Sequence, residues 1–468
     1  MLPKTLSTPL LLLAAAGTIA SAARAQTPAT PQVVAFLHAN VVPMDRERVL
    51  RDQTVVVSNG QIIAVGPGAS VKVPDGALRI DAQGRYLLPA LCDMHVHLLN
   101  DAWKMMLRPE ALAASKVVPD EQFLFPYLAN GVTTVQVLSA TPEDLAVRAR
   151  IERGELLGPR MILAPMIDGP KKAWPPPISI WVGDAAEARA AVIKAKRDGY
   201  DKVKAYSFLS RESYDALVTA AKELDMDVIG HVPMALSVEY VIDAGQKLIA
   251  HSEELGKHTK GDLSAERIEY FADLMVRRGV WLIPTLVTSH SIFDLVADPG
   301  AVLGRPESAY FQHAMEQGVW SFIADNLYLP MSPQHRQSIR DGYENFQRPL
   351  TKLMHDKGGR LLAGSDAPLP GLVPGFALHR ELRELVDVGL TPFAALRTAT
   401  TAPFEYLGES ERSGMIAVGQ HSDVLLVDAN PLEDIAALSQ VSGVLLRGRW
   451  IGKAEIQRRL QQLALKGK

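Results

Sequence analysis

The middle of the chain alternates short apolar segments with longer amphipathic ones, and this alternation limits the fold more than any other feature. Helix-like stretches such as residues 185–199 and 211–225 separate the apolar segments. Alternating strands and helices predict a parallel α/β domain. About eight repeats favour a (β/α)8 TIM barrel, with a doubly wound sheet as the competing topology. The expected strands are "ALCDMHVHL", "GVTTVQVL", "RMILAPM", "DKVKAY", "DVIGHVP", "KLIAHSE", "WLIPTLV" and "RLLAGSD".

Strand-like segments also occupy both ends of the chain. Residues 33–80 contain short runs broken by turn signals, and the turn at 58–61 is typical of a β-hairpin. Similar runs return in "GMIAVGQHSDVLLVDA" and "VSGVLLRGRWI". We therefore expect the two ends to pair into a small composite β-sandwich domain. Its N-terminal part would be residues 26–87 and its C-terminal part 412–468, with the barrel at 88–411.

The first 25 residues have the pattern of a secretory signal peptide. Lys4 gives a positive start, an apolar run follows, and Ala23-Arg24-Ala25 is a small-x-small cleavage site. The apolar run is too short to span a bilayer, and a polar, proline-broken tether follows it. We therefore expect cleavage near Ala25, a periplasmic or secreted mature protein, and no stable membrane insertion.

Composition limits the partners and the stabilising elements. The single cysteine, Cys92, allows no intrachain disulfide, so the 47% of residues that are hydrophobic must supply the core. The formal net charge is -3, and no basic run or aromatic-basic alternation appears. Nucleic acid is therefore not an expected partner. We expect a small-molecule substrate, and the sequence leaves homo-oligomer formation open.

One connection is far longer than a normal loop between a strand and a helix. It runs from residue 288 to 359 and carries aromatic residues within a helical pattern. We expect it to form an inserted helical layer. The sequence supports equally a lid over the site and a layer that only packs on itself.

One short segment carries two histidines and an aspartate at every second position. In "LCDMHVHL", residues 91–98, the side chains of Asp93, His95 and His97 would share one face of an extended strand. The opposite face would be apolar. Taken alone, such a segment is more typical of a strand edge with solvated histidines than of a metal site.

Four further residues with metal-binding potential lie near the ends of later strands. The functional residues of a parallel barrel lie at the carboxyl ends of its strands. These four residues should therefore converge with His95 and His97 on one rim of the barrel. Four imidazoles and one carboxylate favour zinc or a neighbouring transition metal over magnesium or calcium. The further residues are Lys204, near the end of the fourth strand, and His231, His251 and Asp366, at the ends of the fifth, sixth and eighth.

Lys204 can join such a site only as a modified side chain. A protonated lysine has three donors and no acceptor, so it cannot bind a cation. Burial beside metal ions would lower its pKa, and a neutral amine can take up carbon dioxide to become a carbamate that bridges two metals. Alone, Lys204 would be interpreted as a strand-end lysine. Lys202 shares its strand face but lies deeper, so Lys204 is the better candidate.

Five motifs resemble, in order and spacing, those of the amidohydrolase superfamily: "PALCDMHVHL", "GYDKVKAY", "VIGHVP", "IAHSEE" and "LLAGSDAP". Within it, the sequence is most similar to the binuclear imidazolonepropionase-like and Xaa-Pro dipeptidase-like members. The stretch at 401–435 resembles the same group, and the resemblance covers nearly all of the mature chain. The sequence departs at Ala90, where glycine is usual, at Cys92, and in "TTVQVL", which lacks the usual Arg-Asp pair.

The resemblance implies a binuclear metal site whose cofactors are two divalent ions, with zinc expected. The ligands it implies are His95, His97 and Asp366 for the more buried ion, His231 and His251 for the more exposed ion, and carbamylated Lys204 between them.

A metal pair of this kind would perform hydrolysis. Two metals that share one water bring its pKa toward neutrality and direct a hydroxide at a bound carbonyl. Asp366 would take the proton and pass it to the leaving nitrogen. Tyr206, nearer the rim than Lys204, would contact a substrate carboxylate or the developing oxyanion, unless it is only a packed rim residue. Trp174 or Trp181 would wall the pocket beside an apolar substrate.

The expected function is therefore cleavage of an amide or peptide C–N bond in a small substrate such as a dipeptide or an N-acyl amino acid. A lactonase or a phosphotriesterase with the same metal pair is an alternative. A mononuclear deaminase is disfavoured because that chemistry has no use for Lys204. A non-catalytic metal-binding protein is disfavoured by the intact ligand set.

Overall fold

The computed structural model describes residues 33–68, 70–98, 120–170, 174–310, 320–421 and 423–466. The expected signal peptide, residues 1–25, lies outside the described residues. Within the described ranges, no helix combines the length and the apolar character needed to cross a bilayer.

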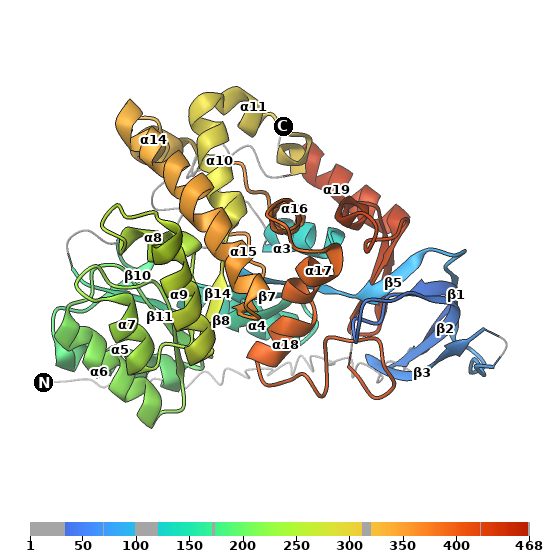
Figure 1. The fold of residues 1–468 in the computed structure, drawn as a ribbon. Helices are drawn as coiled ribbons and strands as arrows, with labels where there is room; N and C mark the ends of the chain where they lie inside the picture. Colours follow the sequence, from blue (N-terminus) through green and yellow to red (C-terminus); the bar gives the residue numbers. More distant parts are fainter. Residues whose placement is uncertain are drawn as a thin grey trace, which may run out of the picture.

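One eight-stranded sheet combines strands from both ends of the chain (Figure 1). From the N-terminal end come β1 (Val33–Val41), β2 (Leu50–Ser58), β3 (Gln61–Pro67), β4 (Leu78–Asp81) and β5 (Tyr86–Pro89). From the C-terminal end come β16 (Val424–Val427), β17 (Val441–Leu446) and β18 (Arg449–Gly452). The order is β18-β17-β16-β5-β1-β2-β3, with β4 on β1. The two ends meet where β5 pairs antiparallel with β16, and the sandwich arrangement expected for them stays a prediction.

The middle of the chain forms two parallel sheets. The first contains β6 (Leu91–Val96), β7 (Val132–Val137) and β8 (Arg160–Leu163). The second has, in spatial order, β10 (Ser179–Trp181), β9 (Met166–Asp168), β11 (Lys202–Ala205), β12 (Asp227–Gly230), β13 (Leu248–Ala250), β14 (Trp281–Ile283) and β15 (Arg360–Leu361).

Two junctions connect these sheets. β8 and β9 follow each other closely, and β8 pairs with β7 while β9 pairs with β11. On the other side, the amide of Met94 donates to the carbonyl of Ala363 at 2.9 Å, and that of His97 to Ala367 at 2.7 Å. These bonds join β6 to the segment that follows β15. The middle of the chain therefore has a TIM-barrel-like α/β arrangement.

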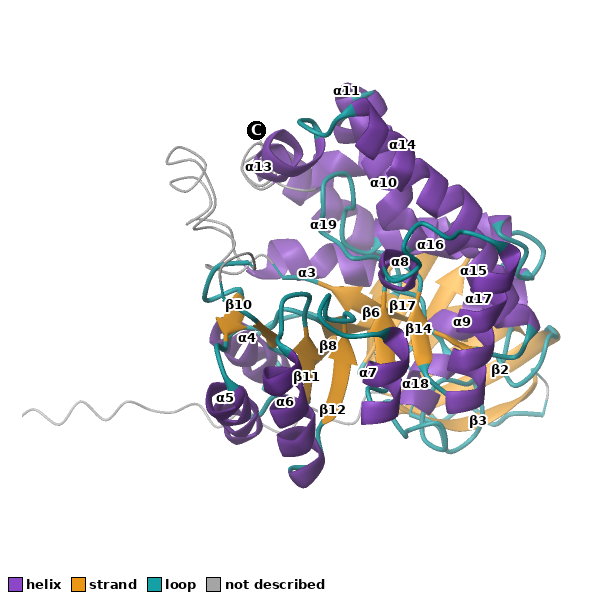
Figure 2. Cartoon of the chain, turned by 60° about the vertical axis from the view of Figure 1, so that its left-hand side comes forward, coloured by secondary structure: helices purple, strands orange, loops and turns teal. Residues whose placement is uncertain are grey.

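Helices cover the parallel strands (Figure 2). The repeating pattern is clear in α9 (Ala265–Arg278), where Ile268, Phe271, Ala272 and Met275 form one buried face. Ser264 caps the start of α9, and Gly279, with φ +64°, ends it. The other helices that accompany the strands are α3 (Asp120–Ala129), α4 (Pro142–Glu152), α5 (Ala185–Asp198), α6 (Arg211–Glu223), α7 (Val238–Ala244), α8 (Ser252–Lys257), α16 (Phe376–Asp387), α17 (Pro392–Ala399) and α18 (Thr401–Tyr406). The last helix, α19 (Lys453–Lys466), follows β18.

The long connection between β14 and β15 is helical in its described parts. The indole nitrogen of Trp320 donates to the carbonyl of Pro368 at 2.7 Å, so the insertion is anchored to the loop that follows β15. Whether it acts as a lid stays a prediction. Its elements are α10 (Leu286–Ala297), α11 (Pro299–Leu303), the 3-10 turn Pro306–Tyr310, α13 (Ser321–Ile323), the π-helical turn η3 (Ala324–Tyr328), α14 (Pro333–Gly342), the π-helical turn η4 (Tyr343–Gln347) and α15 (Arg348–Asp356).

Candidate active site

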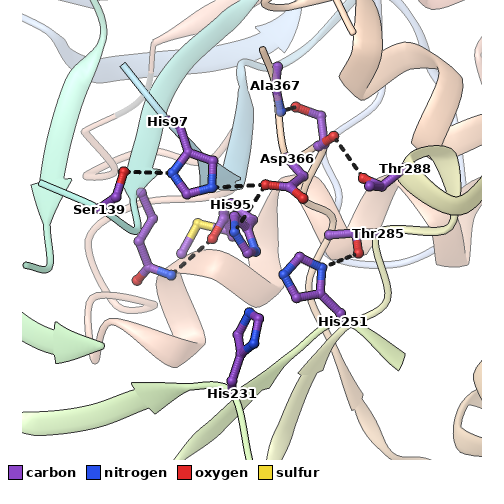
Figure 3. Close-up of polar contacts among 12 residues, drawn as sticks. His95, His97, Ser139, His231, His251, Thr285, Thr288, Asp366 and Ala367 are labelled. Atoms are coloured by element: carbon purple, nitrogen blue, oxygen red, sulfur yellow. Dashed lines mark hydrogen bonds and ion pairs between the residues drawn. The ribbon is translucent and has the colours of Figure 1, made fainter. Parts of the chain in front are cut away.

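The six residues predicted as metal ligands come together at the carboxyl ends of the parallel strands. Figure 3 shows His95, His97 and His251 near the carboxylate of Asp366, with His231 farther from it, on the side of His95 and His251. A cavity of about 170 Å³ opens at this place. Among the residues that line it are His97, Lys204, Tyr206, His231, His251 and Asp366. His95 lies beneath them, fully buried.

Distances within the group are those of a shared binding site. Nε2 of His97 lies 2.9 Å from Oδ1 of Asp366, and Nε2 of His95 lies 3.3 Å from the same oxygen. The ring centres of His95 and His251 are 4.5 Å apart, and those of His231 and His251 are 5.0 Å apart. His95, His251 and Asp366 each offer a ligand atom within 4.8 Å of the others.

Two glycines allow the strands to bring these side chains so close. Gly230, directly before His231, has φ +116°, and a Cβ there would lie 2.5 Å from the carbonyl oxygen of Ala205. A Cβ on Gly364 would lie 2.7 Å from the Cβ of His95. Real Cβ atoms do not approach other atoms so closely, so only glycine fits at either position.

Hydrogen bonds at Nδ1 fix the tautomers of His231 and His251. The Thr285 hydroxyl donates to the carbonyl of Pro284 at 2.8 Å, so it accepts the bond from Nδ1 of His251 at 2.7 Å. The Glu254 carboxylate, 3.0 Å from Nδ1 of His231, can only accept. Both rings therefore carry their proton on Nδ1, and each keeps a lone pair on Nε2.

Several of the remaining ring nitrogens are buried and form no hydrogen bond within the described part of the chain. Nε2 of His231 and both ring nitrogens of His95 have no hydrogen-bond partner among the described residues. Buried polar atoms in folded proteins almost always have one. A cation bound by lone pairs would satisfy such nitrogens, and imidazole and carboxylate are the donors that zinc and its neighbours prefer. The residues therefore fit a transition-metal site.

Burial sets the charges in the site. It lowers the pKa of His231 to about 4 and that of His251 to about 3, so both rings are neutral at pH 7. Burial also lowers the pKa of the Lys204 ammonium to about 8, against the attraction of Asp366. Burial opposes ionisation of Asp366, but the hydrogen bond from His97 and the neighbouring imidazoles keep its pKa below the usual value. The site thus offers neutral imidazoles, an ionised carboxylate and a lysine that loses its proton readily.

Asp93 does not share the cavity with the two histidines, contrary to the expectation from strict alternation. The register between β6 and β7 shifts between Asp93 and Val96, which breaks the alternation of side chains. The Asp93 carboxylate instead accepts the amide of Ser365 at 2.9 Å and its hydroxyl at 2.6 Å. This contact holds the backbone next to Asp366, which has an unusual positive φ of 56°.

Of the other residues considered for the site, two line the cavity and two do not. Tyr206 lines the cavity, with its ring centre 4.1 Å from that of His231, and Trp174 lines it too. Trp181 is 41% exposed and is not among the lining residues. Lys202 is also not among them, because its ammonium binds Asp227 at 2.6 Å. Lys204, the preferred candidate, is the lysine of this strand that reaches the cavity.

Sequence reasoning missed several residues that line or support the site. Glu254 supports His231. The available signal was its position three residues after the predicted ligand His251, on the short helix that begins directly after that histidine. Tyr328 reaches the cavity from the insertion, and nothing in the sequence indicates which of its aromatic residues does so. Others are Ser139 and Thr285, which bond Nδ1 of His97 and His251, and Glu253, Lys257, Ile292 and Leu369, which line the cavity.

Comparison with known proteins places the chain in a family. The amidohydrolase family matches residues 86–451. An adenine deaminase of Ruegeria sp. (strain TM1040) is 30% identical over 409 residues, which cover 86% of this chain and 55% of that protein. An imidazolonepropionase of Stenotrophomonas maltophilia (strain R551-3) is 31% identical over 121 residues, 24% of this chain and 28% of that protein. The chain thus spans about half the length, or less, of these relatives.

Solved structures share the fold. A putative prolidase from Bifidobacterium longum superposes with a TM-score of 0.69 at 24% identity, covering 92% of this chain and 99% of that one. A Xaa-Pro dipeptidase with methionine bound in its active site gives 0.66 at 22% identity, covering 90% and 100%. At these identities the likeness concerns the fold alone. Because the family match extends from β5 to β18 and includes every strand end of the site, the chain belongs to the amidohydrolase family.

Proposed function

We propose that this protein is an exported, metal-dependent hydrolase that cleaves an amide or peptide C–N bond in a small substrate such as a dipeptide or an N-acyl amino acid. The observation that carries the proposal is the set of buried ring nitrogens on His95 and His231 that form no hydrogen bond with any described residue, although they lie beside Asp366 and Lys204. Membership of the amidohydrolase family supports C–N hydrolysis. The closed eight-stranded barrel, the β-sandwich and the boundaries 26–87, 88–411 and 412–468 belong to the same proposal.

The residues of the site are suited to two divalent ions, with zinc as the proposed metal. When bound, such ions activate a water molecule and polarise the scissile carbonyl. The proposed ligands are His95, His97 and Asp366 for one ion, His231 and His251 for the other, and carbamylated Lys204 between the two.

The chain's own groups orient the reaction and move the proton. The Asp366 carboxylate accepts the proton of the attacking water and returns it to the leaving nitrogen, a role that needs the ionised state its neighbours maintain. The phenol of Tyr206 accepts a bond from the indole of Trp174 at 3.3 Å, so its own proton remains available for a substrate oxygen. Glu254 and Thr285 keep His231 and His251 in the tautomer that presents Nε2.

Adenine deamination is the second candidate. The relative of that name is 30% identical over 86% of this chain, and deamination also breaks a C–N bond. The chain spans only 55% of that protein's length, so the whole protein's activity does not carry over directly.

The test is a hydrolysis screen of the purified protein before and after metal removal. The panel contains Xaa-Pro dipeptides, N-acyl amino acids and adenine. The proposal expects turnover of a dipeptide or an N-acyl amino acid that a chelator abolishes and zinc restores. Ammonia release from adenine alone would select the second candidate, and no C–N cleavage by the zinc-loaded protein would reject both.

Export is a separate part of the proposal. It is supported by the positive start, the short apolar run and the cleavage pattern at Ala25. N-terminal sequencing of the mature protein should begin at Gln26 or close to it, in a periplasmic or secreted fraction. An intact Met1 in the cytoplasmic fraction would contradict this part.

A further inference from the structure

A second cavity lies at the amino-terminal ends of two parallel strands, away from the candidate active site. Its volume is about 430 Å³, against about 170 Å³ for the cavity at the candidate site. Trp281 begins β14 and Arg360 begins β15, and both side chains line this second cavity. The carboxyl ends of the same strands lead to Thr285 and Asp366 of the candidate site. The parallel strands therefore separate the two cavities.

The lining of the second cavity is largely apolar. The buried side chains of Trp281, Leu361 and Leu390 form part of it. Phe393 and Ala402 extend the apolar surface. Small-molecule sites are commonly cavities of about 300–1,000 Å³ with apolar walls and a few polar groups. The size and the lining of this cavity are those of such a site.

Two exposed arginines that line the cavity have no carboxylate partner among the described residues. The guanidinium of Arg360 lies over the ring of Trp281, 5.3 Å from its centre, and its Nη1 donates to the carbonyl of Gly279 at 3.4 Å. Nε of Arg397 donates to the hydroxyl of Thr401 at 3.5 Å. Each of these long bonds uses one of the five N–H groups of a guanidinium, so both arginines keep donors for a ligand.

The charges around the cavity match an anion with a single negative charge. Arg360 and Arg397 supply two positive charges, and Glu405 is the one acidic side chain among the described lining residues. Burial lowers the pKa of His355, so this lining imidazole is neutral at pH 7. A planar guanidinium binds a carboxylate through two parallel N–H···O bonds. A carboxylate that carries an apolar group therefore matches both the arginines and the apolar lining.

We propose that this cavity is a second ligand site, separate from the metal site, which binds a small apolar carboxylate. The carboxylate group pairs with Arg360 and Arg397, and the apolar group packs on Trp281 and Leu390. The inference goes beyond the proposed function and does not depend on it.

The experiment is isothermal titration calorimetry of the purified protein with 4-phenylbutanoate. 4-Phenylbutanamide has the same apolar group without the charge, and phenyl phosphate carries a larger negative charge. The proteins are the wild type, Arg360→Gln, Arg397→Gln and Glu405→Gln. Arg189→Gln is the matched control, because Arg189 is an exposed arginine that pairs with Glu223. Each titration is repeated after metal removal, because a carboxylate can also bind metal ions in the candidate active site.

The metal-free wild type should bind one equivalent of 4-phenylbutanoate, and the amide about tenfold more weakly. Arg360→Gln and Arg397→Gln should each weaken carboxylate binding about fivefold to twentyfold, less than for a buried charged hydrogen bond because both arginines are exposed. Glu405→Gln should strengthen it about twofold to fivefold, because a like charge is removed. Arg189→Gln should bind like the wild type.

Four results would overturn the inference. Equal binding of acid and amide would show an apolar cavity without an anion site. Carboxylate binding that disappears with the metal, or that is unchanged in both arginine variants, would place the probe elsewhere. Tighter binding of phenyl phosphate would assign the cavity to a phosphate ligand instead of a carboxylate. Absence of binding up to about 10 mM probe would remove the site.

Discussion

Replacement of Glu254 by glutamine tests how much of the site depends on a residue that binds no metal. The Glu254 carboxylate is 1% exposed. Its Oε1 accepts from Nδ1 of His231 at 3.0 Å and from Nζ of Lys257 at 2.6 Å, and its Oε2 accepts from the amide of Val232 at 3.1 Å. Glutamine keeps the shape, but its NH2 group would face one of these donors, and the negative charge would be lost.

The magnitude follows from these contacts. A buried hydrogen bond to a charged group contributes about 1.5–3 kcal/mol, so the free energy of unfolding should fall by about 2 kcal/mol in Glu254→Gln. His231 would lose the acceptor that fixes its tautomer. Loss of such a supporting group typically weakens metal binding about 10- to 100-fold, which is about 1.4–2.8 kcal/mol.

The assay is zinc retention against a chelator of graded concentration, combined with denaturant unfolding. Glu253→Gln is the matched control, because Glu253 is 47% exposed and contacts Lys257 without reaching His231. Glu254→Gln should release one ion per chain at a lower chelator concentration than the wild type, and Glu253→Gln should not. Equal retention in all three proteins would refute the role assigned to Glu254.

The same variant has a defined pH dependence. Although burial opposes its ionisation, His231 and Lys257 hold the pKa of the Glu254 carboxyl well below its usual range. A lowered folded-state pKa contributes stability above the unfolded pKa of about 4.3, and this stability is lost as pH falls. The difference in unfolding free energy between wild type and Glu254→Gln should therefore shrink below about pH 4. A difference that grows on acidification would contradict the ion-pair assignment.

Three further predictions concern the ligands themselves. Asp366→Asn should lower kcat about 10²- to 10⁴-fold, measured by steady-state kinetics on the zinc-loaded enzyme, because the proton acceptor is lost; a change in KM alone would contradict this. Lys204→Ala should lower the zinc content measured by elemental analysis. If Lys204 is carbamylated, the metal-free wild type should regain more activity when zinc is added with bicarbonate than when zinc is added without carbon dioxide. The metal-free protein should lose stability to denaturant as pH falls from about 6.5 toward 4. In that range unfolded chains protonate His231 and His251, whereas burial keeps both rings neutral in the fold; constant stability there would contradict the buried neutral state.

The residues at the strand ends could be predicted because one rule of parallel sheets applies to all of them. The carboxyl ends of parallel strands meet at one edge, so His231, His251 and Asp366 could be placed beside His95 from the alternating pattern alone. The pairing of both chain ends in one sheet was accessible for a similar reason, since each end has short alternating runs. Lys204 could be placed at the same edge by its strand end, but its role as a ligand also depended on carbamate chemistry and on the resemblance, because a protonated lysine has no acceptor.

The remaining features depend on geometry that a linear pattern does not encode. The register shift after Asp93 moves its carboxylate to Ser365, and strict alternation cannot detect such a shift. Tyr328 reaches the cavity because the insertion folds back on the barrel, a contact set by tertiary packing. The bonds to Thr285 and Glu254 require the positions of whole loops at the ends of neighbouring strands.

Elemental analysis of the purified, zinc-reconstituted protein tests the central claim most directly. If residues from five separate strand ends bind a pair of ions around one reactive centre, the wild type should hold about two zinc ions per chain, and a chelator that removes them should abolish hydrolysis. A protein that binds no zinc, or that hydrolyses its substrate equally well after complete metal removal, would contradict the account.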